Sequence, residues 1–186
     1  MDKTGDILYD EYLNGDNSAV EKLVKLYRAP LCRFICGIVG NYDNAEDITQ
    51  ETFVAVLVKK PKNKHDASFK TWLFSIGRNK AIDFLRKNSK IQKVNIDDYF
   101  EIADDSFSIE SKLENEELNK ALFTAMKKIS PEYATVLYLT YFENFKIEHI
   151  SKILKKSAHS TSSLLYRAKA ALKKELQKEG FDYEDR

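Results

Sequence analysis

Apolar residues at helical spacing constrain this chain more than any other feature. They recur at intervals of four, three and four positions, at Leu118, Leu122, Ala125 and Ile129. This spacing places them on one face of an α-helix. Ser130 and Pro131 follow directly, and serine before proline is typical of an N-cap and the first residue of a new helix. The pattern therefore predicts two consecutive helices.

Residues that interrupt helices are scarce throughout. The chain has 6 glycines and 3 prolines in 186 residues, and 43% of its residues are hydrophobic. This composition favours helices over a turn-rich β protein and supplies enough apolar material for folded cores. We predict an all-α protein with two small helical domains, at residues 1–90 and 113–178. Residues 91–112 are predicted to be an acidic linker, and residues 179–186 a tail.

Charge is distributed unevenly, although the net charge is only +1. Residues 59–93 contain 11 Lys and Arg against two acids, and residues 151–178 contain eight against one. Between them, residues 97–117 hold nine acids against a single lysine. This order indicates two anion-binding lobes joined by an acidic connection.

Several classes of protein are disfavoured. Residues 1–10 lack the pattern of a signal peptide, and the longest uncharged run has ten residues, where a membrane span needs about twenty. A soluble, cytoplasmic protein is expected. Cys32 and Cys36 share a helix face, but no further ligand lies nearby, so buried thiols are favoured over a metal site. We find no catalytic pattern, and expect no enzyme activity, cofactor or small-molecule substrate.

The segment AEDITQETFVAVL, residues 45–57, is predicted to form a helix with an acidic face. Asp47, Gln50, Glu51 and Val54 recur on one side of it. Acids near the start of a helix are also explained by the helix dipole alone. Their combination with a glutamine and an apolar end is better explained by contact with a partner protein.

The segment FKTWLFSIGRNKAIDFLRK, residues 69–87, combines aromatic and basic residues. Single-stranded nucleic acid is bound by such surfaces, because bases stack on rings while Lys and Arg track phosphates. The alternative is that the aromatic residues form the core and the charges a solvated face. For Trp72 the two interpretations are evenly balanced.

The segment IEHISKILKKSAHSTSSLLYRAKAALKK, residues 147–174, has the helix lengths and turn placement of a helix-turn-helix. Leu165, Ala168 and Leu172 are predicted to face inward from its second helix. The outward side then carries residues suited to a major groove, namely Ser160, Ser162, Ser163, Tyr166, Arg167 and Lys169.

Together these blocks resemble the extracytoplasmic-function group of RNA polymerase sigma factors. Residues 45–57 resemble the family's polymerase-binding helix, and residues 69–87 its promoter-melting segment, both in region two. The run LFTAMKKISPEYATVLYLTYFENFKIEHISKIL, residues 122–154, resembles the start of region four. The blocks stand in the right order, and the two regions together cover about four-fifths of the chain.

The resemblance implies a protein that binds core RNA polymerase, directs it to promoters and helps to melt promoter DNA. Polymerase binding is expected at Asp47, Gln50, Glu51, Phe53 and Val54. The minus-ten element is expected at Lys62, Asn63, Lys64, His65, Trp72, Arg78, Asn79, Arg86 and Lys87. The outward helix-turn-helix residues are expected at the minus-thirty-five element. An anti-sigma factor is a possible further partner.

The chain departs from the family in its last two helices. Lys155 stands where a glycine is usual in the turn, and Ser162 and Leu164 stand where basic residues are common. Fewer side chains here can make bidentate contacts to bases. One alternative is a stand-alone helix-turn-helix regulator, and another is an adaptor that has lost DNA binding. The regulator does not explain both an acidic and a basic aromatic face in the first domain, and only the depleted recognition helix supports the adaptor.

Overall fold

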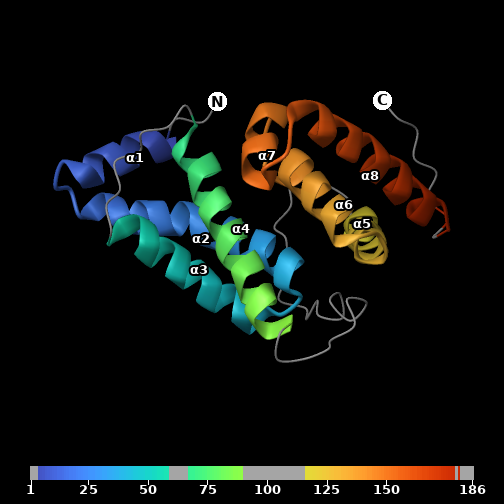
Figure 1. The fold of residues 1–186 in the computed structure, drawn as a ribbon, viewed down its shortest axis with the longest axis horizontal. Coiled ribbons are helices and arrows are strands. Elements are labelled where there is room, and N and C mark those ends of the chain that lie inside the picture. The colour runs from blue at the N-terminus through green and yellow to red at the C-terminus, as the bar shows by residue number, and fades with distance from the viewer. Residues whose placement is uncertain (1–3, 59–66, 90–115, 179, 181–186) are drawn as a thin grey trace.

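The computed structural model describes residues 4–58, 67–89, 116–178 and 180, and every regular element in these ranges is a helix (Figure 1). The first domain, blue to green, holds α1 (Thr4–Leu13), α2 (Ser18–Val39), α3 (Tyr42–Leu57) and α4 (Phe69–Ser89). The second, yellow to red, holds α5 (Glu116–Lys128), α6 (Pro131–Leu137), the π-helix η2 (Tyr138–Phe142), α7 (Ile147–Leu154) and α8 (Ala158–Lys178). The predicted all-α architecture of two domains is confirmed. The predicted linker lies outside the described residues.

Helix α2 is the centre of the first domain and packs against α1, α3 and α4. Leu31 and Ile35 of α2 are fully buried, as is Leu73 of α4. Burying side chains of this size contributes about 1.5–3 kcal/mol each. Gly77 lets α4 cross α2 closely, because a Cβ atom there would lie 2.9 Å from Leu31 Cδ1. Pro30 lies inside α2, which continues through it.

Polar side chains fix the helix ends of the first domain. The Asn44 N–H donates to Asn41 Oδ1 over 2.9 Å, which caps α3. The Thr71 N–H donates to Ser68 Oγ at 3.4 Å at the start of α4. There the Phe69 N–H also donates to Asp6 Oδ1 at 2.5 Å. Asp6 belongs to α1, a helix that the sequence did not predict, so the position of α4 depends on a residue 63 positions earlier.

The second domain begins with the predicted pair of helices. Ser130 caps α6 by accepting from the Tyr133 N–H, and Pro131 is its first residue. Ala125 and Ile129 of the predicted apolar stripe are buried, and Leu122 is partly buried. Helix α8 packs along α5, α6 and α7. The two predicted consecutive helices therefore form part of this domain's core.

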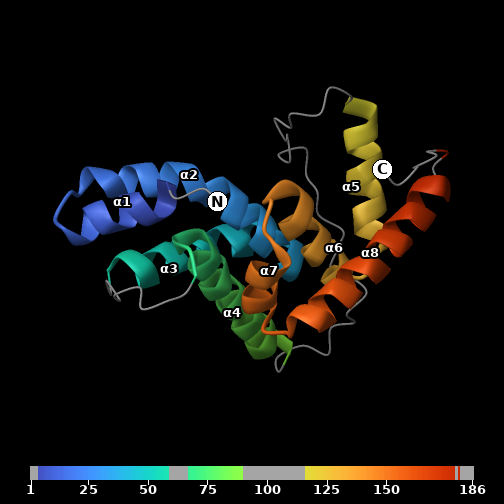
Figure 2. The same ribbon diagram turned by 90° about the horizontal axis from the view of Figure 1, so that it is seen from above.

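The two domains are packed against each other. Helix α7 lies against α4, and α6 lies against α2 (Figure 2). A single cluster of buried residues runs from α2 and α4 into η2 and α7, and it includes Leu31, Phe74, Tyr138 and Phe145. The contact is therefore partly apolar, like the interior of either domain.

Candidate nucleic-acid and protein interfaces

Helix α3 presents one exposed face made of acids and apolar residues. Asp47, Gln50 and Glu51 are exposed, and the face continues to Val54 (58% exposed) and Val58 (73% exposed). The opposite side of the helix is buried, including Ile48, Thr49 and Thr52. Neighbouring large exposed apolar residues are typical of a surface that a partner protein covers.

Phe53 does not lie on that face. Its side chain is 7% exposed and belongs to the core of the first domain. It is one residue from Val54, and neighbouring residues of a helix point about 100° apart. The structure therefore brings together four of the five residues predicted for polymerase binding, with Phe53 supporting them from inside.

Ion pairs connect α3 to its neighbours. Glu46 pairs with Arg28 of α2, and the hydrogen bond from that guanidinium holds the pKa of Glu46 below its ordinary value. Glu51 pairs with Lys80 of α4, with Nζ and Oε2 2.9 Å apart. Asp47 is exposed on the acidic face of α3.

Helix α4 carries the predicted residues of the basic aromatic surface. Arg86 and Lys87 are exposed near its end, and Asn79 is half-buried. Arg78 is also half-buried, and burial lowers the pKa of its guanidinium while nearby Glu132 of α6 opposes this. Lys62, Asn63, Lys64 and His65 lie outside the described residues.

Trp72 stands in an aromatic cluster. Its ring lies 5.5 Å from the ring of Tyr9 and 6.0 Å from that of Phe69, edge-on to both. The side chain is half-buried. Trp72, in the first turn of α4, thus packs against Tyr9 of α1 and Phe69 of its own helix. Its part in binding nucleic acid stays a prediction.

Helices α7 and α8 form the predicted helix-turn-helix. Lys155 ends α7 in the left-handed conformation, with φ 55°, at the position where glycine was expected. The Ser160 N–H donates to Ser157 Oγ at 3.0 Å, at the start of α8. The turn geometry is therefore kept without glycine.

The outward side of α8 agrees with the predicted set. Exposed residues are Ser160, Ser162, Tyr166, Arg167 and Lys169, while Ser163 is half-buried. Lys169 Nζ lies 5.6 Å from the centre of the exposed Tyr141 ring, an attractive cation–π arrangement. On the inward side Leu164 is buried and Leu165 only half-buried, so Leu164 contributes more to the core than the sequence indicated.

Sequence reasoning missed a polar network between the domains, formed by Lys70 and Thr71 of α4 with Tyr138, Glu143 and His149 of the second domain. The sequence around a polar residue in a helix does not indicate which distant residue it contacts. No local signal therefore identified these residues. In the part of the chain that the structure describes, no cluster of three acidic, histidine or cysteine residues could hold a metal ion. No helix among the described residues has the length and apolarity needed to cross a membrane.

A two-domain helical protein with a helix-turn-helix and a separate acidic partner face belongs to the class of DNA-binding proteins that work with another protein. Comparison with known families shows which DNA-binding proteins of this class the chain resembles. Residues 23–91 match the family described as Sigma-70 region 2, and residues 119–172 match Sigma-70, region 4.

Individual relatives agree with these two family matches. The RNA polymerase sigma factor SigV of Bacillus subtilis (strain 168) is 30% identical over 148 residues, which cover 79% of this chain and 84% of SigV. The ECF RNA polymerase sigma factor SigW of the same organism is 26% identical over 171 residues, covering 88% and 91%. The sigma factor RpoE from Bartonella quintana, solved with the anti-sigma factor NepR, has the same fold, with a TM-score of 0.68 and 21% identity over 84% of this chain and 96% of RpoE.

The chain belongs to the extracytoplasmic-function group of RNA polymerase sigma factors. It functions in promoter-directed initiation of transcription by RNA polymerase. This family is not one of catalytic enzymes.

Proposed function

We propose that three surfaces of this chain divide the work of initiation. The exposed face of α3 binds core polymerase through Asp47, Gln50, Glu51 and Val54. Helix α4 and the segment 62–65 before it hold the melted minus-ten element. The outward side of α8 binds duplex DNA at the minus-thirty-five element. The sigma factor acts by binding alone, in the cytoplasm, where its polymerase is.

The segregation of charge supports this proposal most directly. The face of α3 carries exposed acids and valines, whereas α4 ends in the exposed cations Arg86 and Lys87. An acidic surface repels DNA and suits a protein partner, while a basic one attracts phosphates. Captured bases stacked on aromatic rings would contribute about 1–3 kcal/mol each, which offsets the cost of unstacking the duplex.

Run-off transcription tests the proposal. Core polymerase is combined with the purified protein on DNA from upstream of the protein's own gene, because such factors often start their own genes. A discrete transcript that requires both components is the expected result. Core polymerase alone is the control. Binding to DNA without core, and no transcript with it, would contradict the proposal.

An anti-sigma factor is included among the proposed partners. The solved structures of RpoE and CnrH are complexes with NepR and with the cytosolic domain of CnrY. A protein that binds this chain and stops its run-off transcription would have the property that this part of the proposal requires.

A further inference from the structure

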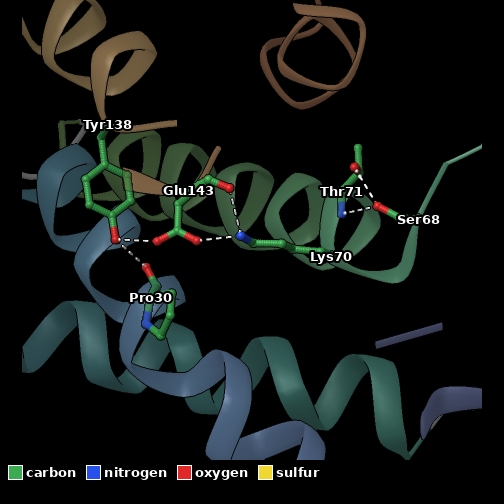
Figure 3. A network of polar contacts seen from close by, with 6 residues as sticks. All are labelled: Pro30, Ser68, Lys70, Thr71, Tyr138 and Glu143. Carbon is green, nitrogen blue, oxygen red and sulfur yellow. Dashed lines mark hydrogen bonds and ion pairs between the residues drawn. The ribbon is translucent and has the colours of Figure 1, made fainter. Parts of the chain in front are cut away.

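The π-helix η2 presents one aromatic ring to solvent. Leu139 of η2 is fully buried, and the rings of Tyr138 and Phe142 stack with their centres 5.5 Å apart. The Tyr138 hydroxyl lies 2.9 Å from Glu143 Oε1, so this side chain points inward (Figure 3). Tyr141 is 47% exposed, and it is the exposed residue of η2. The inward residues therefore fix the position of the short helix from which the Tyr141 ring projects.

The Tyr141 ring lies beside a lysine of α8. Lys169 Nζ is 5.6 Å from the centre of the ring, within the distance at which an aromatic face attracts an ammonium group. Lys169 and Tyr166 are three residues apart and both are exposed, so they share the outward side of α8. The contact therefore connects η2, which precedes the helix-turn-helix, to the side of α8 assigned to duplex DNA.

That side of α8 has few cations. Among the outward residues predicted to contact DNA, Arg167 and Lys169 are the basic ones. Arg167 Nε donates to the Ser163 carbonyl oxygen of its own helix at 3.3 Å, whereas Lys169 contacts a ring from another element. A long side chain loses rotamer freedom when it binds, and restricting the side chain beforehand lowers that cost. With so few cations, the direction of each one has a larger effect on DNA affinity.

We propose that Tyr141 positions Lys169 for a phosphate of duplex DNA, so that the surface for the minus-thirty-five element includes a residue outside the helix-turn-helix. This inference rests on the proposed function, because the outward side of α8 must contact DNA for Lys169 to reach a phosphate. The lysine ammonium has three N–H donors, so contact with a ring on one side leaves donors for a phosphate on the other. Tyr141 acts through its ring, and its hydroxyl is not required.

The test uses holoenzyme assembled from core polymerase and the full-length protein. The probe is a fluorescent duplex from upstream of the protein's own gene, and anisotropy measures its affinity. Tyr141→Leu removes the ring, and Tyr141→Phe keeps it as the matched control. We expect about two- to fivefold weaker binding for Tyr141→Leu and wild-type binding for Tyr141→Phe. Wild-type affinity of Tyr141→Leu, or an equal loss in Tyr141→Phe, would overturn the proposal.

The Lys169→Ala background separates positioning from direct contact. If Tyr141 acts through Lys169, Tyr141→Leu should cause no further loss of affinity once Lys169 is absent. A ring that contacts DNA by itself would cause the same loss in both backgrounds, and so would a variant that damages the second domain. Equal losses in the two backgrounds would therefore overturn the positioning role.

Lys169→Ala alone distinguishes failure of the proposed function. If this variant binds the duplex as tightly as wild type, the outward side of α8 does not contact a phosphate at this position, and the proposed function fails there. If Lys169→Ala weakens binding but Tyr141→Leu does not, the proposed function stands and the role of Tyr141 is refuted.

Discussion

The Lys80 ammonium of α4 lies 2.9 Å from the Glu51 carboxylate of α3, so the basic helix and the acidic face are joined by an ion pair. The side chain of Glu51 is 66% exposed, so solvent screens the pair and it contributes about 0–1 kcal/mol. Breaking this pair would therefore cost little if Glu51 contacts a cation of another protein, as the proposed function requires.

Reversing the charge of the α3 face should abolish polymerase binding and leave the fold intact. In Asp47→Arg combined with Glu51→Arg, both changes lie at exposed positions, where substitutions seldom alter stability by more than about 0.5 kcal/mol. Native gel shift with core polymerase measures binding, and thermal unfolding measures the fold. Lys80→Ala is the control, because it removes the ion pair but keeps the acids. A double variant that still binds core polymerase at physiological salt would show that polymerase binds a surface other than the exposed face of α3.

Trp72→Ala should destabilise the first domain as well as impair promoter opening. The edge-on contacts with Tyr9 and Phe69 are lost, and we expect a loss of about 3 kcal/mol in the free energy of unfolding. Trp72→Phe keeps an aromatic ring for packing and stacking, so it should lose much less of both properties. Denaturant unfolding is compared with open-complex formation on duplex and pre-melted promoters. An unchanged unfolding midpoint for Trp72→Ala would contradict the packing role.

Lys155→Gly should stabilise the second domain. Lys155 has φ 55°, and a residue with a Cβ atom in the left-handed region loses about 1–2 kcal/mol relative to an ordinary conformation. We expect a gain of about 1 kcal/mol in denaturant unfolding. Asn144→Gly is the matched comparison, since Asn144 has φ 54° but asparagine tolerates that region better. Equal gains at both sites, or a loss at Lys155, would refute the strain argument.

The Cys36 thiol should make stability depend on pH in the alkaline range. Burial raises its pKa from 9.0 to about 11. Because the folded state holds the proton more tightly, this contribution is complete below about pH 9 and is lost as the pH rises through about 11. The free energy of unfolding of wild type should fall between these values by about 2 kcal/mol more than that of Cys36→Ala. Parallel pH profiles would contradict the prediction.

Lys169→Ala should weaken binding of the holoenzyme to duplex promoter DNA similarly for different sequences. Lys169 is exposed on α8 and suits a phosphate contact rather than a base contact. The slope of log affinity against log salt should fall by about one. Lys178→Ala, in a pair with Glu175 at the end of α8, is the control. An unchanged slope would show that Lys169 does not contact DNA.

The sequence was sufficient for most helices and for the outward faces of α3 and α8, because the alternation of apolar and polar residues reports which side of a helix is covered. It did not reveal α1, where the buried Tyr9 and Tyr12 stand in a short, largely polar run. The resemblance also assigned Phe53 to polymerase binding, although its side chain is buried. An aromatic residue beside an exposed valine can belong to either side until the neighbouring helix is known.

The contact between the domains could not be predicted in this way. Lys70 and Glu143 are 73 residues apart and each resembles a surface charge, yet the carboxylate is buried. Helical periodicity describes each helix separately, whereas the crossing of α4 and α7 depends on the packing of both domains together. The tertiary structure was needed to identify this contact.

The number of residues in the π turn of η2 determines whether Glu143 faces Lys70. The Glu143 N–H donates to the Tyr138 carbonyl oxygen five residues earlier, at 3.2 Å, so that one residue more than an α-helical turn separates them. Deleting one codon within residues 139–142 would restore an α-helical register and rotate Glu143 by about 100° away from Lys70. A substitution at the exposed Tyr141 would leave the register unchanged. An insertion or deletion within this turn would therefore separate Glu143 from Lys70, which no single substitution at an exposed position of the turn would do.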